Sequence, residues 1–278
     1  MPSPRLTPLT RDSIERALTT RSLGRSLQVL SDTSSTNAVA LDAAEAGAPD
    51  GAVIVADRQS AGRGRLGRTW RSPGGLNLYC SIIIRHLPTD ERLGWLPLIS
   101  ATATAQAITQ MTTVSPALKW PNDVMVGTRK VGGILCETHG LGRGSAYAVV
   151  GIGLNVNWRH DEMPAELRTI ATSLADEGQA PVDRATLLAS LLLELESRLD
   201  LWRTGSLPSL SQEYQDLCGT IGQPVRVELE SGKVLEGIAT DVGRDGSLRL
   251  IDSTTTPPTA HLIHSGDVRH LRADPPRP

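Results

Sequence analysis

Residues 58–70 form a glycine- and arginine-rich loop between two apolar, strand-like segments, 52–56 and 76–84. The loop reads RQSAGRGRLGRTW, so glycines and arginines alternate before a closing tryptophan. Glycine lets a ligand approach backbone N–H groups closely, and arginine offers a fork of donors that matches phosphate or carboxylate oxygens. Because strands hold both ends, the loop predicts an anion-binding segment rather than an RGG-like nucleic-acid tail. A solvated basic loop is the alternative for this motif taken alone.

Apolar periodicity around this loop predicts an α/β domain built on a mixed sheet that helices flank. Runs rich in β-branched residues predict strands over residues 27–30, 51–57, 76–85, 117–120, 123–126, 130–137 and 146–156. Repeating apolar faces predict helices over residues 12–20, 37–46, 93–111 and 184–202. A Ser/Thr cluster before the second of these helices and Gly47 after it are start and stop signals.

The composition changes after Cys218. Ser-Gly, Asp-Gly and Thr/Pro loops separate short predicted strands over residues 224–230, 233–241, 247–251 and 260–263. This spacing predicts a small all-β barrel of roughly 50 residues. We therefore divide the chain into an N-terminal extension (1–25), an α/β domain (26–219), the barrel (220–272) and a tail (273–278).

Charge and composition exclude several classes of protein. Among 278 residues, 28 basic and 30 acidic side chains leave a net charge of −2, which argues against bulk nucleic-acid binding. The three cysteines are widely spaced, so they favour neither a disulfide framework nor a zinc site, as expected in a reducing compartment. No apolar h-region follows the N-terminus, and the longest apolar run, 187–195, is too short to cross a bilayer. We expect a cytoplasmic protein that does not enter a membrane.

Two polar clusters follow predicted strands. TSSTN at 33–37 packs five short polar side chains into a strand-to-helix turn, although one helix cap needs only one of them. The other polar side chains of the cluster suit contacts with a small polar group of a ligand. A helix-capping cluster is the simpler interpretation of this motif alone. KWPND at 119–123 places a cation, an amide and a carboxylate at a proline bend. A turn explains Pro121 and Asn122 but not their charged and aromatic neighbours.

Two other segments carry glycine inside a predicted strand. RKVGGIL at 129–135 has paired glycines after two cations, and GIGLNVN at 151–157 alternates glycine with apolar residues. Such glycines often mark close approach by a ligand, although a β-turn tail is the alternative for the first motif. The second motif lacks the third glycine and the following helix of a dinucleotide fingerprint. The sequence contains no P-loop, HExxH, CxxC or GxSxG motif, and its histidines have no ligand spacing except His261 and His264, which we expect on the barrel surface.

Taken in order, SSTN, GRGRLGRTW, KWPND, RKVGGIL and GIGLNVN resemble the motifs of the biotin protein ligases. The resemblance runs from about Val29 to the end of the chain, and the predicted barrel matches the SH3-like domain of that family. It implies that residues 26–219 form a class II synthetase-like catalytic domain that binds biotin and ATP. Each motif is weak alone, but five motifs in one order at compatible spacing make a specific match.

The resemblance assigns roles to individual residues. The ureido head of biotin would be held by Ser35, Thr36, Asn37 and Gln59. The biotin carboxylate and the α-phosphate would be contacted by Arg63, Gly64, Arg65 and Lys130. The nucleotide would be contacted by Arg65, Arg68, Trp70, Asn122, Asp123, Lys130, Gly132 and Asn155, with Trp70 stacked on adenine and Asp123 near the metal or the phosphates. Lys130 and Arg65 are the predicted catalytic residues, and no residue is assigned as a metal ligand.

The implied reaction has two steps, with Mg²⁺ beside the nucleotide. The biotin carboxylate attacks the α-phosphate of ATP, which gives biotinyl-5′-AMP and pyrophosphate. The lysine amine of a biotin carboxyl carrier protein then attacks this anhydride and releases AMP. Both transition states concentrate negative charge on phosphate and acyl oxygens, which fixed cations stabilise, and no side-chain nucleophile is needed. Ordering of the loop over the adenylate would exclude water.

The chain departs from the family pattern in two places. About 25 residues precede the first predicted strand, too few for the winged helix-turn-helix of bifunctional members, so we expect a monofunctional ligase without operator binding. Some members of the family stack adenine on a tryptophan that comes later in the sequence. This chain reads ATSL at that place, 171–174, and has no tryptophan there. Trp70 is therefore the expected stacking surface for adenine, and Trp158 is a weaker choice. The alternative functions are a lipoate ligase or octanoyl transferase of the same fold, and a non-catalytic biotin-responsive DNA-binding regulator. We expect a monomer or a weak homodimer.

Overall fold

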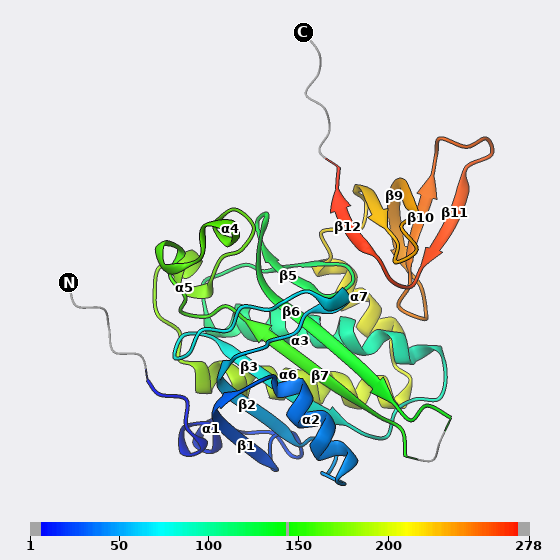
Figure 1. The fold of residues 1–278 in the computed structure, drawn as a ribbon. Helices are drawn as coiled ribbons and strands as arrows, with labels where there is room; N and C mark the ends of the chain where they lie inside the picture. Colours follow the sequence, from blue (N-terminus) through cyan, green and yellow to red (C-terminus); the bar gives the residue numbers. More distant parts are fainter. Residues whose placement is uncertain (1–6, 143–144, 272–278) are drawn as a thin grey trace.

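The computed structural model describes residues 7–142 and 145–271, which form a large α/β unit and a small β unit (Figure 1). The strands of the large unit are β1 (Leu27–Thr33), β2 (Val53–Gln59), β3 (Leu78–Ile84), β4 (Ala117–Lys119), β5 (Asp123–Val126), β6 (Arg129–His139) and β7 (Tyr147–Leu154). Its α-helices are α1 (Arg11–Ala17), α2 (Thr36–Glu45), α3 (Leu96–Met111), α4 (Ala165–Arg168), α5 (Leu174–Gly178), α6 (Arg184–Thr204) and α7 (Leu207–Leu217). The small unit contains β8 (Pro224–Glu228), β9 (Val234–Val242), β10 (Leu248–Asp252), β11 (Thr259–Ile263) and β12 (Asp267–His270). The predicted mixed fold with a small C-terminal β unit is confirmed.

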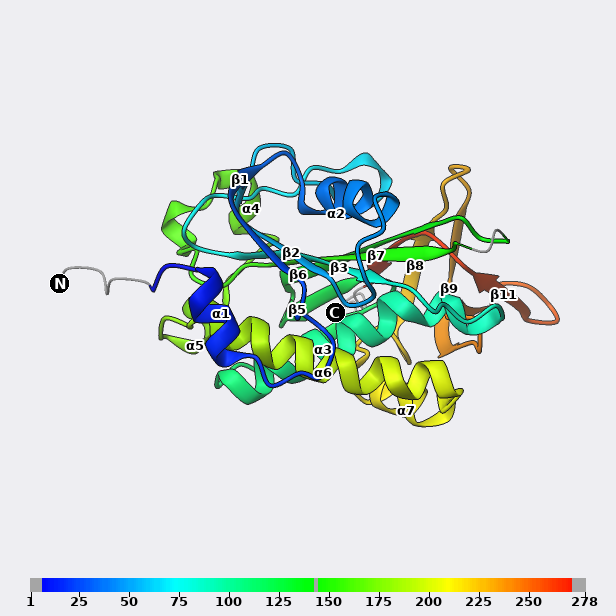
Figure 2. The ribbon, with the colours of Figure 1, turned by 90° about the horizontal axis from the view of Figure 1, so that it is seen from below.

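The seven strands of the large sheet follow the order β1-β2-β3-β7-β6-β5-β4. Strands β1 and β2 are parallel, and every other neighbouring pair is antiparallel. Helix α2 lies on one side of the sheet, whereas α1, α3, α6 and α7 lie on the other (Figure 2). One side is therefore a thick packed layer, and the side with α2 has room for a cavity.

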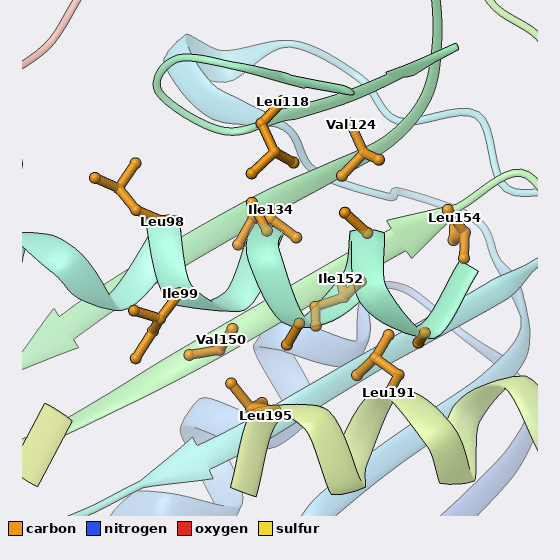
Figure 3. Close-up of a cluster of buried hydrophobic side chains, with 14 of the residues drawn as sticks. Leu98, Ile99, Leu118, Val124, Ile134, Val150, Ile152, Leu154, Leu191 and Leu195 are labelled. Carbon is orange, nitrogen blue, oxygen red and sulfur yellow. The ribbon is translucent and has the colours of Figure 1, made fainter. Parts of the chain in front are cut away.

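The main core fills the space between the sheet and helices α3 and α6 (Figure 3). Ile152 and Leu154 of β7 belong to this cluster. Because side chains alternate across a strand, the residues between them face α2. Val149 packs there in a second cluster with α2, but Gly151 and Gly153 come next. Beyond α2, β7 therefore presents glycines to this side of the sheet, and side chains from other segments can approach its backbone.

The small unit is an antiparallel sheet with the order β11-β10-β9-β8-β12, and its β9–β10 turn docks against the large unit. The buried indoles of Trp95 and Trp120 each donate a hydrogen bond of 3.0 Å to this turn, to the carbonyls of Gly243 and Gly246. A Cβ on Gly94 would lie 1.9 Å from a backbone oxygen of the turn. This backbone-to-backbone contact fixes where the small sheet sits.

A carboxylate on α6 anchors the segment before β1. Glu196 accepts hydrogen bonds of 2.7 to 3.0 Å from the backbone N–H groups of Arg21, Ser22 and Leu23, and another of 2.8 Å from the Ser22 hydroxyl. Burial alone would raise the pKa of Glu196, but these hydrogen bonds outweigh it and lower the pKa to about 2. The segment is thus tied to the longest helix of the large unit.

Most predicted elements are present, with shifted ends, but some details differ from the expectations. Ser35 is the N-cap residue of α2, but its side chain makes no capping hydrogen bond, so the interpretation of the Ser/Thr cluster as a side-chain cap is wrong. Helices α4, α5 and α7 and strand β12 were not predicted. Gly47 ends α2 as expected, with a φ of 90° that favours glycine.

Two properties of the described residues bear on the class of protein, namely the absence of a membrane-spanning helix among them and the state of two cysteines. None of the described helices is both long enough and apolar enough to cross a membrane. Cys80 is fully buried, which raises the pKa of its thiol to about 12, and desolvation also raises the pKa of the half-buried Cys136, so neither thiol is activated as a nucleophile.

Candidate active site

A cavity of about 450 Å³ opens on the α2 side of the sheet, between the glycine/arginine loop, strands β5 to β7 and the small sheet. The glycines of β7 make room for it. A Cβ on Gly151 would lie 2.0 Å from the side-chain oxygen of Asn37, and one on Gly153 would lie 2.6 Å from the indole nitrogen of Trp70. Two missing side chains therefore let the polar cluster and the loop reach the sheet.

The cavity collects the residues that the motifs singled out, although they come from five separate segments. It is lined by Ser35, Thr36, Asn37, Gln59, Arg63, Gly64, Arg65, Arg68, Trp70, Asn122, Asp123, Lys130 and Asn155. Gly132 is the exception among the predicted site residues. A Cβ there would meet Leu154 of the core at 2.9 Å, so Gly132 faces away and Gly133 faces the cavity.

The end of the cavity beside α2 is a network of small polar groups. Gln59 accepts from the backbone N–H of Thr36 at 2.8 Å and from its hydroxyl at 3.1 Å, and its amide donates to Ser72 at 2.9 Å. Ser81 lies 2.8 Å from the Thr36 hydroxyl and 2.6 Å from the Asn37 side-chain oxygen. We call this network the head pocket. Neither serine was predicted, although Ser81 is the only polar residue of the apolar strand β3.

The loop crosses the cavity to the small sheet. Arg65 donates to the side chain of Asn122 at 3.3 Å and to the hydroxyl of Ser265 at 2.8 Å, so it joins KWPND to the small sheet. Desolvation lowers the pKa of Arg65, but a guanidinium stays charged at any ordinary pH. Between Arg65 and Gly67 the loop makes one 3₁₀ turn, in which Leu66 takes a left-handed φ of 55°.

Three cations of the cavity are each paired with a carboxylate of the same chain. Lys130 contacts Asp123 in an ion pair along the cavity wall. Arg68 contacts Asp267 at 2.7 Å, and this hydrogen bond lowers the pKa of Asp267. The third pair joins Arg63 to a carboxylate of β6, Glu137, at 3.0 Å. Sequence motifs could not identify Asp267 or Glu137, because only the fold brings β12 and the far half of β6 to the loop.

Trp70 closes one wall of the cavity. Lys130 Nζ lies 5.4 Å from the centroid of its ring, within the range of a cation–π contact. Among the described residues, the buried indole N–H of Trp70 has no hydrogen-bond partner, which is unusual for a buried donor. Trp158, the weaker candidate for adenine stacking, also lines the cavity. An aromatic wall and an unpaired donor thus lie beside the cations.

Two amides of the cavity wall are held by backbone carbonyls. Asn155 donates to the carbonyl of Thr172 at 3.0 Å, and Asn122 donates to the carbonyl of Ile134 at 2.9 Å. The side-chain oxygen of Asn122 also accepts from Arg65 at 3.3 Å, so this amide is held from both sides. The described residues contain no group of three or more His, Cys, Asp and Glu side chains that would hold a metal ion. The whole site fits a ligand with an amide-like head, an anionic middle and an aromatic end.

Two family models match the chain. The model of the biotin/lipoate A/B protein ligase family matches residues 29–155, which hold all five motifs down to Asn155. The model of the biotin protein ligase C-terminal domain matches residues 220–271, which include the small sheet.

Relatives and solved structures agree with these matches. The chain is 38% identical to the biotin–[acetyl-CoA-carboxylase] ligase of Mycobacterium tuberculosis, over 93% of this chain and 96% of that protein. It is 32% identical to the bifunctional ligase/repressor BirA of Bacillus subtilis, over 87% of this chain and 74% of BirA. A biotin protein ligase from Aquifex aeolicus, solved with biotin and ATP, superposes with a TM-score of 0.76 at 28% identity, over 89% of this chain and 100% of that one. Sequence, fold and cavity together show that the chain belongs to the biotin protein ligase family.

Proposed function

We propose that this protein is a biotin–[biotin carboxyl carrier protein] ligase, which makes biotinyl-5′-AMP from biotin and ATP and transfers biotin to a carrier lysine. One observation carries the proposal. A single cavity joins the head pocket, made of hydroxyl and amide groups, to a cluster of cations beside Trp70. The head pocket matches the ureido ring of a biotinyl adenylate, which offers both donors and acceptors. The cations match the phosphate in the middle of that molecule, and Trp70 matches the adenine at its other end.

The cations supply the chemistry of the first step. A carboxylate oxygen of biotin forms a bond to the α-phosphorus of ATP, and the bond to the bridging oxygen of the β-phosphate breaks, so pyrophosphate leaves. Negative charge grows on the phosphate oxygens, and Lys130 and Arg65 stabilise it as fixed donors inside the cavity. Asn122 orients Arg65 through its side-chain oxygen.

The second step needs an amine but no protein nucleophile. The neutral amine of the carrier lysine forms a bond to the acyl carbon and releases one proton to solvent, while the acyl–phosphate bond breaks and AMP leaves with the electron pair. The same cations stabilise the departing phosphate. The loop excludes water from the anhydride while the carrier approaches.

Mg²⁺ fits the donors of the cavity. Mg²⁺ in nucleotide sites binds one or two carboxylates together with phosphate oxygens, so a complete protein cage is not required. Asp123 and Asp267 both line the cavity and are the carboxylates available for this role. When bound, Mg²⁺ would neutralise charge on the phosphates of ATP.

We infer the remaining properties from the family and from charge. The carrier is a biotin carboxyl carrier protein or domain, the enzyme works in the cytoplasm, and it is a monomer or a weak homodimer. Because the net charge is −2, we expect no bulk nucleic-acid binding. A gel shift at physiological salt tests the last point, and tight binding to DNA would reject it.

The substrate assignment is tested by incubating the protein with ATP, Mg²⁺ and either biotin or lipoate, followed by mass detection of the adenylate. A biotinyl adenylate is expected, because the head pocket presents hydrogen-bonding groups that the dithiolane of lipoate cannot pair. Lipoyl adenylate as the main product would identify a lipoate ligase instead. Transfer to a purified biotin carboxyl carrier domain then tests the second step.

A further inference from the structure

Glu137 joins the loop to the head pocket, and neither the motifs nor the proposed reaction requires it. It lies on β6, two residues beyond the end of the RKVGGIL motif, and its carboxylate is partly buried. One of its oxygens, Oε2, accepts a hydrogen bond from Asn37 at 2.8 Å and also contacts Arg63 at 3.0 Å. A single atom thus connects the wall of the pocket with the loop that covers it.

The contact with Asn37 fixes the direction of a buried amide. The Asn37 side chain is 4% exposed, and its nitrogen donates to Glu137 while its oxygen accepts from Ser81. A carboxylate can only accept, so it holds the amide with nitrogen toward β6 and oxygen over Gly151. The Asn37 nitrogen also lies 3.4 Å from the backbone carbonyl of Leu135, so Glu137 makes the shorter of the two contacts that orient this amide.

The contact with Arg63 holds one side of the loop. On the other side, Arg65 and Arg68 are tied to Ser265 and Asp267 of the small sheet. Among the described residues, Arg63 makes no other side-chain hydrogen bond or ion pair, so its tie to Glu137 is the one that faces the head pocket. The loop is thereby supported across the cavity from both ends.

We propose that Glu137 is a positioning residue that closes the glycine/arginine loop over the head pocket and so controls how long the biotinyl group stays bound. It acts through Arg63 and Asn37 and does not touch the reacting atoms. This inference rests on the proposed function for the identity of the ligand. Its effect falls on retention of biotin and of the adenylate rather than on the rate of adenylate formation.

The test uses the full-length protein with Glu137→Gln, which keeps the shape and removes the charge. Biotin binding is titrated without ATP, and release of preformed labelled biotinyl-AMP is followed after a chase with excess unlabelled adenylate. Because partly exposed ion pairs are weak, we expect about three- to tenfold faster release and a similar rise in the biotin Kd. The single-turnover rate of adenylate formation at saturating biotin and ATP should stay within about twofold of the unchanged protein.

A second variant and a control make the result specific. Arg63→Gln breaks the loop contact of Glu137, leaves its contact with Asn37, and also removes the predicted contact of Arg63 with the ligand anion. It should therefore speed release at least as much as Glu137→Gln, while the double variant should release no faster than the faster single variant. Glu236→Gln removes the same kind of Arg–Glu pair on the small sheet, Arg226–Glu236 at 3.3 Å, and should release at the unchanged rate. Unchanged release from Glu137→Gln, or additive effects of the two single variants, would overturn the proposal. Absence of any adenylate from the unchanged protein would instead reject the proposed function, and the titration would still test Glu137.

Discussion

Glycines of one strand decide what the cavity can hold. Gly151 and Gly153 occupy alternate positions of β7, and each is replaced in space by a side chain from another segment, Asn37 or Trp70. A strand normally covers both of its faces with side chains, so these positions exchange local packing for a surface that a flat ligand can approach. Single residues therefore set the shape of the site.

Gly153→Ala is expected to weaken nucleotide binding without unfolding the protein. The added Cβ would lie 2.6 Å from the indole nitrogen of Trp70, so the ring must move. We expect the KM for ATP to rise about tenfold, because base stacking is worth roughly 1–3 kcal/mol. Steady-state kinetics with a thermal melt checks this, and an unchanged KM in a folded variant would remove Trp70 from the nucleotide site.

Lys130→Ala is expected to abolish adenylate formation while the fold survives. Lys130 faces Asp123 at the surface of the cavity rather than in the core, so its loss costs little packing. Removing one fixed donor to a developing anion lowers the rate by about 100-fold or more. Pyrophosphate release measures the rate, and near-normal activity with a native melt would exclude Lys130 as a catalytic residue.

The sequence motifs identified the residues that line the cavity, but they did not identify the carboxylates that pair with Arg63 and Arg68. Residues of a motif stand together in the sequence, so Thr36, Asn122 and Lys130 could be found without a structure. Glu137 pairs with Arg63 and Asp267 pairs with Arg68, but both carboxylates lie outside the motifs, Glu137 at the end of a predicted strand. Their roles arise from contacts between distant segments, which a single sequence does not contain.

At the scale of elements, helix α6 contributes many buried side chains to the core and also anchors the segment that precedes β1. Its Glu196 accepts four hydrogen bonds from residues 21–23. The helix was predictable from its repeating leucines. Helix α7 was missed although Leu207, Leu210 and Tyr214 repeat on one of its faces, because its middle is polar and it is followed by the domain boundary. Strand β12 reads DVRH and has one apolar residue, the buried Val268, so no apolar pattern reveals it.

Glu196→Gln is expected to lower stability by about 2 kcal/mol at neutral pH, because hydrogen bonds to a buried charge are lost. The pKa of Glu196 is about 2 in the folded protein, below the value of about 4.3 for an unfolded glutamate. Its contribution is therefore complete above the unfolded value and is lost as the pH falls toward about 2. Denaturant unfolding at pH 7 and pH 3 checks this, and a gap between variant and unchanged protein that did not narrow in acid would contradict it.

At the scale of the whole molecule, a small contact between two backbone segments holds the small sheet against the large unit. The turn between β9 and β10 rests on Gly94 and on two indoles, while Ser265 and Asp267 of the same small sheet reach the loop. The position of the small sheet is therefore transmitted to the cations of the cavity. The sequence indicated a separate β unit, but nothing in it indicated where that unit docks.

Gly94→Ala is expected to impair catalysis from outside the cavity. Its Cβ would lie 1.9 Å from the backbone oxygen of Asp245, so the small sheet must shift and loosen Arg68 and Arg65. We expect kcat/KM for ATP to fall about tenfold or more, since small displacements of positioning groups are costly. Gly219→Ala is the matched control, because a Cβ there has its nearest neighbour at 3.8 Å. Equal activity of the two variants, measured by pyrophosphate release, would show that docking does not reach the site.

The pairing of Lys130, Arg68 and Arg63 with carboxylates of the same chain has a consequence for binding. These three cations are already neutralised by carboxylates of the chain itself. A carboxylate or phosphate that contacts one of them has to displace its internal partner, so the number of ion pairs changes little. Small inorganic anions then gain little by entering, and only a molecule that also fills the head pocket or the aromatic wall makes the exchange favourable. Selectivity in such a site comes from what is attached to the anion rather than from the strength of the charges.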